Sequence, residues 1–335
     1  MYRMPAEWAP HEATWLAWPH ELSDWPGKFE PVPYLYAEIV RILSRREHVR
    51  ILAPAAVQPQ AKSLLRKAGA WNANVRFVTA ATNRSWTRDY CPLYVKSEDG
   101  VRAATKWQFN GWAKYSDWQN DDKAGERAAR FSKVPLVQPG WNGTRVVLEG
   151  GSIDVNGDGL MLTTEECLLS DVQARNPGIE REQLEALFDG YLGVQKVIWL
   201  NRGITGDDTH GHVDDLARFT NERTVVTVVE EDRADANYEP LQENLALLRR
   251  TKLRVVELPM PQPLWYDHQR LPASYANFYI ANGVVLVPTF HDPNDRIALN
   301  TLAKLLPGRE VIGIHCVDLV LGLGTLHCGT MQEPA

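Results

Sequence analysis

Two patterns of apolar residues alternate along this chain. Segments with an apolar residue every three or four positions are typical of helices with one buried face, and short continuous apolar runs are typical of buried strands. We predict helices over 33–47, 58–68, 121–131, 180–188, 238–250 and 295–306. We predict strands over 49–52, 75–80, 145–149, 194–200, 223–230, 254–258 and 310–314, with a polar loop over 82–89.

Two hairpins are predicted from turn sequences between apolar runs. Residues 153–155 and 160–163 flank Asn156-Gly157-Asp158-Gly159, and residues 278–280 and 284–287 flank Asn282-Gly283. The first turn also matches a calcium-loop pattern that runs from Asp154 to Glu165. That motif requires helices on both sides, and here the flanks are β-like, so we favour a hairpin over a calcium site.

The helices recur about every 60 residues, each followed by a β-rich run, although the sequence itself does not repeat. Alternating strands and helices predict an α/β fold. Five like units suggest a closed, pseudo-symmetric ring forming a single domain over 1–335, with a doubly wound open sheet as the alternative. Polar clusters follow the same period, so a ring would bring them together at one end of its axis: 86–89, 149–151, 212–214, 274–282 and 327–328.

The segment 319–330 is the most distinctive in the chain. A long apolar run reaches a bend flanked by Gly322 and Gly324 and is followed by His327 and Cys328. We predict a buried strand that ends by presenting the thiol as a nucleophile. The alternative is an inert packed cysteine, because free cysteine is among the most buried residue types.

Composition narrows the class of protein. The chain has 335 residues, 44% hydrophobic and 23% charged, with a formal net charge of -6, as in ordinary soluble globular proteins. The acidic balance argues against nucleic acid and for a cationic ligand. Residues 1–20 lack the apolar core of a signal peptide, and no apolar run approaches the ~18 residues of a membrane span. The four cysteines form no C-x-x-C pair, so we expect a reduced cytoplasmic protein that does not bind membranes.

The segment His210-Gly-His212-Val-Asp214-Asp215 has the highest density of chemically active residues. It could be a metal site, a catalytic histidine with a carboxylate on the same side of an extended segment, or a structural polar loop. The other histidines lack ligand spacing, so we favour acid–base catalysis. Asp89, Glu149 and Asp214, together with a histidine and Cys328, suggest a site that traps a cation around a nucleophile.

The motifs also carry a family resemblance. They are Met4–Trp8, Trp86–Tyr90, Phe109–Trp112, Leu148–Ser152, Thr163–Leu169, His212–Asp214, Ala276–Tyr279 and His327-Cys328. In this order, and nearly from end to end, the chain closely resembles the agmatine deiminases of the bacterial peptidyl-arginine deiminase-like family, in the guanidino-group modifying (pentein) superfamily. The resemblance implies a single five-bladed α/β propeller. The chain departs from the family at Cys91 and Leu323, where glycine is usual, and glycine tolerates φ > 0 far better than other residues.

The resemblance implies roles for the site residues. Asp89 and Asp214 would hold a guanidinium while Cys328 attacks its carbon, and Glu149 would orient His212. His212 would protonate the departing ammonia and then activate water, which hydrolyses an S-alkylthiouronium on Cys328. With agmatine the product is N-carbamoylputrescine, a precursor in putrescine and polyamine biosynthesis. We expect no cofactor and no metal. Trp86 and Trp112 would wall the methylene stem, and Asp208 would hold the terminal ammonium.

Several alternatives stay open at this point. The substrate could be free arginine or peptidyl-arginine if Arg88 or Arg202 turned inward to bind a carboxylate. A metal-dependent hydrolase and a non-catalytic guanidine-binding protein are less favoured. Either His212 or the bound cation could ionise the thiol. Such rings often associate, a homodimer being the first expectation, but no sequence feature identifies an interface.

Overall fold

The computed structural model describes residues 2–335 and shows an α/β protein. Within this range the strands form five sheets of three or four strands and two small ribbons. One sheet has the order β21-β2-β3-β4, from Met331–Pro334, His11–Ala17, His48–Ala53 and Val75–Thr79. Another has the order β1-β5-β6-β7, from Tyr2–Arg3, Leu93–Ser97, Arg102–Thr105 and Leu136–Val137.

The other three sheets share one design, in which an antiparallel hairpin is joined by a parallel third strand. They are β10-β11-β12 (Asp154–Val155, Leu160–Thr164, Lys196–Leu200), β13-β14-β15 (Ala217–Asn221, Thr224–Val229, Arg254–Pro259) and β18-β19-β20 (Tyr279–Ala281, Val284–Thr289, Glu310–His315). A parallel partner requires a crossover connection, and a helix supplies it in each sheet. The ribbons are β8-β9 (Gly140–Trp141, Thr144–Arg145) and β16-β17 (Trp265–Tyr266, Gln269–Arg270).

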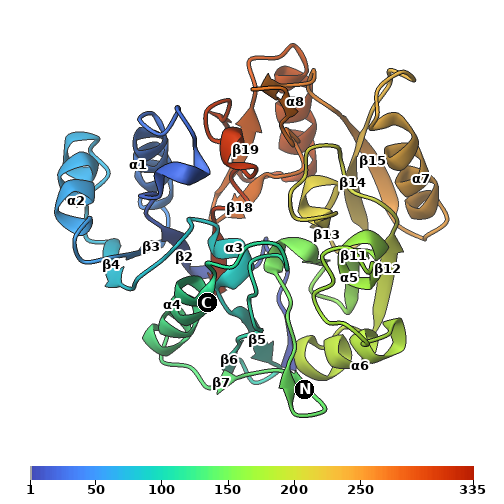
Figure 1. Ribbon diagram of the computed structural model, residues 1–335, viewed down its shortest axis with the longest axis horizontal. Helices are drawn as coiled ribbons and strands as arrows, with labels where there is room; N and C mark the ends of the chain where they lie inside the picture. The colour runs from blue at the N-terminus through green and yellow to red at the C-terminus, as the bar shows by residue number, and fades with distance from the viewer. Residues whose placement is uncertain (1) are drawn as a thin grey trace.

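The long helices lie toward the outside of the molecule, around a centre that holds a short one (Figure 1). The long helices are α1 (Val32–Leu43), α2 (Gln58–Lys67), α4 (Gln119–Phe131), α6 (Arg181–Leu192), α7 (Tyr238–Arg249) and α8 (Asn294–Leu305). The short ones are α3 (Thr87–Tyr90) near the centre and α5 (Glu165–Leu169). α6 illustrates the local rules: a capping box of Glu180 and Gln183 starts it, and left-handed Gly193 ends it.

Most predicted elements are confirmed to within a few residues. All six long helices are present, as are both hairpins, so the calcium-like sequence at 154–165 forms β10 and β11. The predicted alternation of helices and strands in an α/β protein is therefore confirmed. The sequence prediction missed β1, β2, β5, β6, β7, β8, β13, β16, β17, β21 and the short helices, most of which are too short to show a periodicity.

Two predicted strands are wrong. Of 145–149, only Arg145 belongs to a strand, and Val147 makes a single bridge with Gln108 before a 3-10 turn over Gly150–Ser152. The apolar run 319–330 is not a strand either. It forms a 3-10 turn over Val320–Gly322 and then a series of local turns, in which Gly329 donates to Thr325 and Thr330 to His327.

The two departures from the family pattern have different consequences for the backbone. Leu323 takes the left-handed conformation with φ 65°, which is where glycine would be unstrained. Cys91 lies in extended backbone, with φ -71° and ψ 159°, and needs no glycine. The four cysteines form no disulfide within residues 2–335. In the same range no helix is both long enough and apolar enough to cross a bilayer.

Candidate active site

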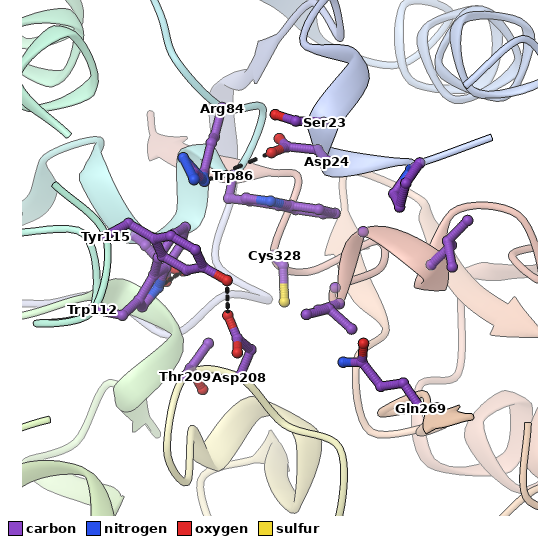
Figure 2. Close-up of a pocket in the computed structure, with 16 residues that line it drawn as sticks. Ser23, Asp24, Arg84, Trp86, Trp112, Tyr115, Asp208, Thr209, Gln269 and Cys328 are labelled. Carbon is purple, nitrogen blue, oxygen red and sulfur yellow. Dashed lines mark hydrogen bonds and ion pairs between the residues drawn. The ribbon is translucent and has the colours of Figure 1, made fainter. Parts of the chain in front are cut away.

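A cavity of about 300 Å³ opens beside Cys328, whose sulfur points toward its middle between Trp86 and Asp208 (Figure 2). Five of the predicted site residues line it: Trp86, Asp89, Trp112, Asp208 and Cys328. The other three, Glu149, His212 and Asp214, lie buried around it. The structure therefore brings together side chains from all the polar clusters that the sequence singled out.

Cys328 sits in the series of turns after β20 rather than at a strand end. The amide of Asn277 donates to its Sγ at 3.1 Å, and Asn277 also accepts from the Thr325 hydroxyl at 2.7 Å. The turn packs closely on the tryptophan wall, because a Cβ at Gly324 would lie 2.9 Å from the Trp86 ring. Burial, followed by the charges of three aspartates, raises the thiol pKa of Cys328 well above its usual value: Asp214, Asp215 and Asp89.

Asp89 is presented by α3, which the sequence analysis had treated as the end of a polar loop. Its Oδ2 accepts from the Trp112 indole at 2.9 Å, and its Oδ1 accepts from the Gly151 amide at 3.1 Å. A Cβ at Gly151 would lie 2.5 Å from Nδ1 of His212, which explains a glycine there. Burial raises the pKa of Asp89 to about 6.

His212 lies between carboxylates on both sides of its ring. Nδ1 is 3.9 Å from Asp89 and 4.0 Å from Asp214, and Nε2 is 3.9 Å from Glu149. Burial alone would lower the pKa of His212, but the charge of Asp89, followed by the interactions with Cys167 and Glu149, raises it well above 6.5, which favours the protonated ring. His212 and Asp214 share one side, as predicted, but through a 3-10 turn over Val213–Asp215 rather than an extended segment.

Glu149 is held by a buried arginine that the sequence analysis missed. Arg175 Nε donates to Glu149 Oε1 at 3.0 Å, and both side chains are fully buried. Although burial opposes it, the Arg175 charge lowers the pKa of Glu149 to about 2, so the carboxylate is ionised. The other oxygen of Glu149 faces His212.

The histidine pair His210 and His212 does not form a metal-ligand cluster. His210 Nε2 lies 3.2 Å from the Ser170 hydroxyl, and its backbone has φ 64°. Within residues 2–335, the group close enough to share one metal ion is Glu149, Cys167 and His212, whose ligand atoms lie within 4.8 Å of one another. Of these residues, Glu149 is held by Arg175, whose fixed positive charge opposes a cation there.

The outer part of the cavity is both acidic and aromatic. Asp208 accepts from the Tyr115 hydroxyl at 2.6 Å and forms an ion pair with Lys114. Asp24, whose pKa burial raises to about 7, lies 3.7 Å from Arg84, which stacks over Tyr115 (Figure 2).

The arginine that lines the cavity is not one of those the sequence suggested. Arg84 lines it, whereas Arg88 pairs with buried Glu7 and Arg202 with Glu243 on the outside. Arg84 could have been identified from the sequence, because it lies in the predicted polar loop over 82–89. Asp24 and Arg175 lie outside the motifs and carry no such signal.

Comparison with known proteins agrees with this geometry. Residues 3–334 match the Porphyromonas-type peptidyl-arginine deiminase family. Agmatine deiminase from Pseudomonas syringae pv. tomato is 34% identical over 364 residues, covering 100% of this chain and 96% of the relative. A Cys-to-Ser variant of C. jejuni agmatine deiminase with substrate bound is 32% identical with a TM-score of 0.90, covering 99% and 96% of the two chains. Agmatine deiminase from Enterococcus faecalis is 30% identical with a TM-score of 0.91, again covering 99% and 96% of the two chains. The chain belongs to the Porphyromonas-type peptidyl-arginine deiminase family.

Proposed function

We propose that the protein is an agmatine deiminase, which hydrolyses agmatine to N-carbamoylputrescine and ammonia. The observation that carries the proposal is the position of Cys328 at the cavity with Asp89, Asp214 and His212 around it. A guanidinium is planar and permanently charged, so two carboxylates can orient it with charge-assisted hydrogen bonds. The named relatives of similar length support the same activity.

Burial and the aspartate charges raise the pKa of the Cys328 thiol, which favours its protonated form in the free protein. The bound guanidinium offsets the negative charges around Cys328 and favours transfer of the thiol proton to water. The thiolate adds to the guanidinium carbon, and protonated His212 donates to the leaving nitrogen. The carbon–nitrogen bond then breaks and ammonia departs, which leaves an S-alkylthiouronium on Cys328.

The second half of the reaction uses the same histidine as a base. Neutral His212 takes a proton from water, the water oxygen adds to the thiouronium carbon, and the carbon–sulfur bond breaks. The product carries a ureido group, and the sulfur is restored. Glu149, ionised and held by Arg175, stabilises the cationic form of His212 in both steps.

The choice of agmatine follows from the outer part of the cavity. Asp208 suits the terminal ammonium, and Trp86 and Trp112 wall the methylene stem. An α-carboxylate beside Asp208 would place like charges together, which costs binding. One observation favours a second candidate, a deiminase of arginine, because Arg84 also lines the cavity. Its charge is already matched by Asp24 and Asp117, so we favour agmatine.

The overall assembly is part of the proposal. The five sheets and their recurring helices support a single domain built as a five-bladed pseudo-symmetric α/β propeller, as in the pentein superfamily. We propose that the chain acts on a small cationic molecule and forms a homodimer, which light scattering of the purified protein would test.

Turnover assays test the function directly. The wild-type protein should release ammonia and a ureido product from agmatine, and Cys328→Ser should lose about three orders of magnitude in kcat, or about 4 kcal/mol. Cys316→Ser, at a buried cysteine outside the cavity, is the matched control and should remain active. A serine variant that kept a tenth of the activity would exclude the covalent route. EDTA should have no effect, and loss of activity together with a bound metal would favour a metal-dependent hydrolase.

A further inference from the structure

A buried histidine that none of these steps uses lies next to Cys328. Nε2 of His327 is 2.8 Å from Glu7 Oε2, and Nδ1 is 2.7 Å from Asp214 Oδ2. Glu7 comes from the segment between β1 and β2, and Asp214 from the turn after His212. The imidazole therefore bridges the start of the chain to the candidate active site, across 320 residues of sequence.

Both neighbours of this ring are ionised carboxylates. Burial would raise the pKa of Glu7, but Arg218, His327 and Arg88 hold it well below its usual value. Burial acts on Asp214 in the same way, and the hydrogen bond and charge of His327 lower its pKa. Each ring nitrogen lies within hydrogen-bond distance of a carboxylate oxygen, so the ring links the two carboxylates directly.

The far side of this bridge is firmly anchored. Glu7 also accepts from Arg88 at 3.1 Å and from the Ile280 amide at 2.8 Å, and it lies 2.9 Å from Arg218. The backbone amide of His327 donates to Asn277, the same residue that holds the Cys328 sulfur. Because its partners and its backbone are held in place, the His327 ring is fixed with Nδ1 directed at Asp214.

The bridge uses one oxygen of Asp214 and leaves the other open. Oδ2 accepts from His327, whereas Oδ1 is buried without a hydrogen-bond partner in the part of the chain that the structure describes. The open oxygen lies 4.0 Å from His212, inside the group of residues proposed to hold the guanidinium. The charged and titratable groups that act on Asp214 are His327, His212, Arg218, Cys328, Asp89 and Asp215.

We propose that His327, anchored by Glu7, is a positioning residue that turns Asp214 so that Oδ1 is open to the substrate guanidinium and keeps that carboxylate charged. The inference rests on the function proposed above. It gives Glu7, in the N-terminal segment, an indirect role in the site, because Glu7 acts through His327 and need not contact the substrate.

The test is the pH profile of kcat/KM for agmatine in His327→Gln. In the wild-type protein we expect the acid limb to follow the cavity carboxylates whose pKa burial raises, Asp89 to about 6 and Asp24 to about 7. Without the His327 ring, buried Asp214 lacks the hydrogen bond that lowers its pKa and must also lose a proton before the guanidinium binds. We therefore expect the acid limb of the kcat/KM profile to become steeper and to shift to higher pH by about one unit. We expect KM for agmatine at pH 7 to rise about tenfold.

His11→Gln is the matched control. His11 is also a buried histidine beside a carboxylate, 3.4 Å from Glu47 and 2.7 Å from the Glu7 carbonyl, and its hydrogen bonds do not involve Asp214. We expect this variant to lose stability but to keep the wild-type acid limb. A role in packing alone would give the two variants the same kinetic behaviour.

The outcomes separate this inference from the proposed function. Active wild-type protein with an unmoved acid limb and KM in His327→Gln would overturn the positioning role. If that variant does not fold, nitrogen-15 spectra of histidine in the wild-type protein decide: a proton on His327 Nδ1, hydrogen-bonded to Asp214, supports it, and an Nδ1 without a proton overturns it. Wild-type protein that fails to hydrolyse agmatine would overturn the function, and the spectra would still decide the state of His327.

Discussion

At the scale of single residues, the site is organised by charge. Four buried carboxylates, Asp89, Glu149, Asp214 and Asp215, surround Cys328 and His212. Burial and the charges of Asp214, Asp215 and Asp89 raise the pKa of the thiol, and the charge of Asp89 raises the pKa of the imidazole although burial opposes it. Both shifts favour the protonated group in the free protein, and the bound cation is the component that changes the balance.

The first prediction concerns this thiol. Asp214→Asn removes the carboxylate 3.7 Å from Sγ, so the thiol pKa should fall and iodoacetamide should alkylate Cys328 about tenfold faster at pH 7. The rate is measured by mass spectrometry of the intact protein from pH 6 to 9. Asp208→Asn, at the outer end of the cavity, is the control and should alkylate like the wild-type. Unchanged or slower alkylation of Asp214→Asn would show that the carboxylates do not set the state of the thiol.

A second prediction concerns substrate choice. Asp208→Asn should lower kcat/KM for agmatine about tenfold and leave that for arginine nearly unchanged, because only agmatine places an ammonium there without a carboxylate. Lys114→Met frees the Asp208 carboxylate from its ion pair and should lower KM for agmatine. The measurement is kcat/KM for agmatine, arginine and arginine methyl ester with each variant. An agmatine-to-arginine ratio that Asp208→Asn leaves unchanged would clear Asp208 of this role.

Residue identities in the site were largely predictable, whereas their partners were not. Asp89, Glu149, His212, Asp214 and Cys328 stand in recognisable motifs, and the structure gathers them. Glu7 and Asn277 stand in recognised motifs, but their contacts with His327 and Cys328 join distant segments, which a single sequence does not show. Arg175 stands outside those motifs altogether. Which arginine lines the cavity also depended on side-chain direction, and the structure selects Arg84.

At the scale of elements, close helix contacts position the catalytic groups. α4 lies against α3, which carries Asp89, and Gly125 is the contact point, since a Cβ there would overlap the carbonyl oxygen of Tyr90. Gly190 in α6 also lies in a helix, but a Cβ there would meet nothing within 4 Å. Substituting alanine at each of these two glycines should therefore change the free energy of unfolding in opposite directions.

The third prediction compares these two glycines. Gly125→Ala should displace α3, lower the free energy of unfolding by about 1–3 kcal/mol and lower kcat with it. Gly190→Ala should raise the free energy of unfolding by about 0.5–1 kcal/mol and leave activity unchanged. Urea unfolding and agmatine turnover of the two variants check both statements. Equal effects of the two substitutions would show that the α3–α4 contact does not position the site.

Elements were predictable where periodicity was strong, which covers the six long helices and both hairpins. The apolar run before Cys328 shows the limit of that approach. Its composition is that of a buried strand, but Gly322, left-handed Leu323 and Gly324 turn the chain back on itself. Burial and strand formation are separate properties, and hydrophobicity alone reports only burial.

At the scale of the whole molecule, buried ion pairs connect the sheets near Glu7. Arg218 of β13 pairs at 2.9 Å both with Glu7 and with Asp154 of β10, and it donates to the Phe278 carbonyl at 2.8 Å. Arg88, next to Asp89, joins through the same carboxylate. The network thus links the β10 and β13 sheets, the segment before β18 and the segment between β1 and β2 to the residue next to Asp89.

The fourth prediction tests this link. Arg218→Met leaves Glu7 and Asp154 short of a buried partner and should lower the free energy of unfolding by about 3–5 kcal/mol. Arg202→Met removes an exposed pair with Glu243 and should change it by less than about 1 kcal/mol. Urea unfolding followed by tryptophan fluorescence measures both. A small loss in Arg218→Met would mean that the sheets associate through apolar packing alone.

The most direct test of the account is mass spectrometry of the protein after an acid quench during agmatine turnover. The covalent route predicts an adduct with the mass of agmatine less ammonia on the peptide that contains Cys328. The adduct should be absent from Cys328→Ser and should appear and decay with turnover. Full turnover with no adduct on that peptide under rapid quench, or an adduct on another cysteine, would contradict the central role given to Cys328.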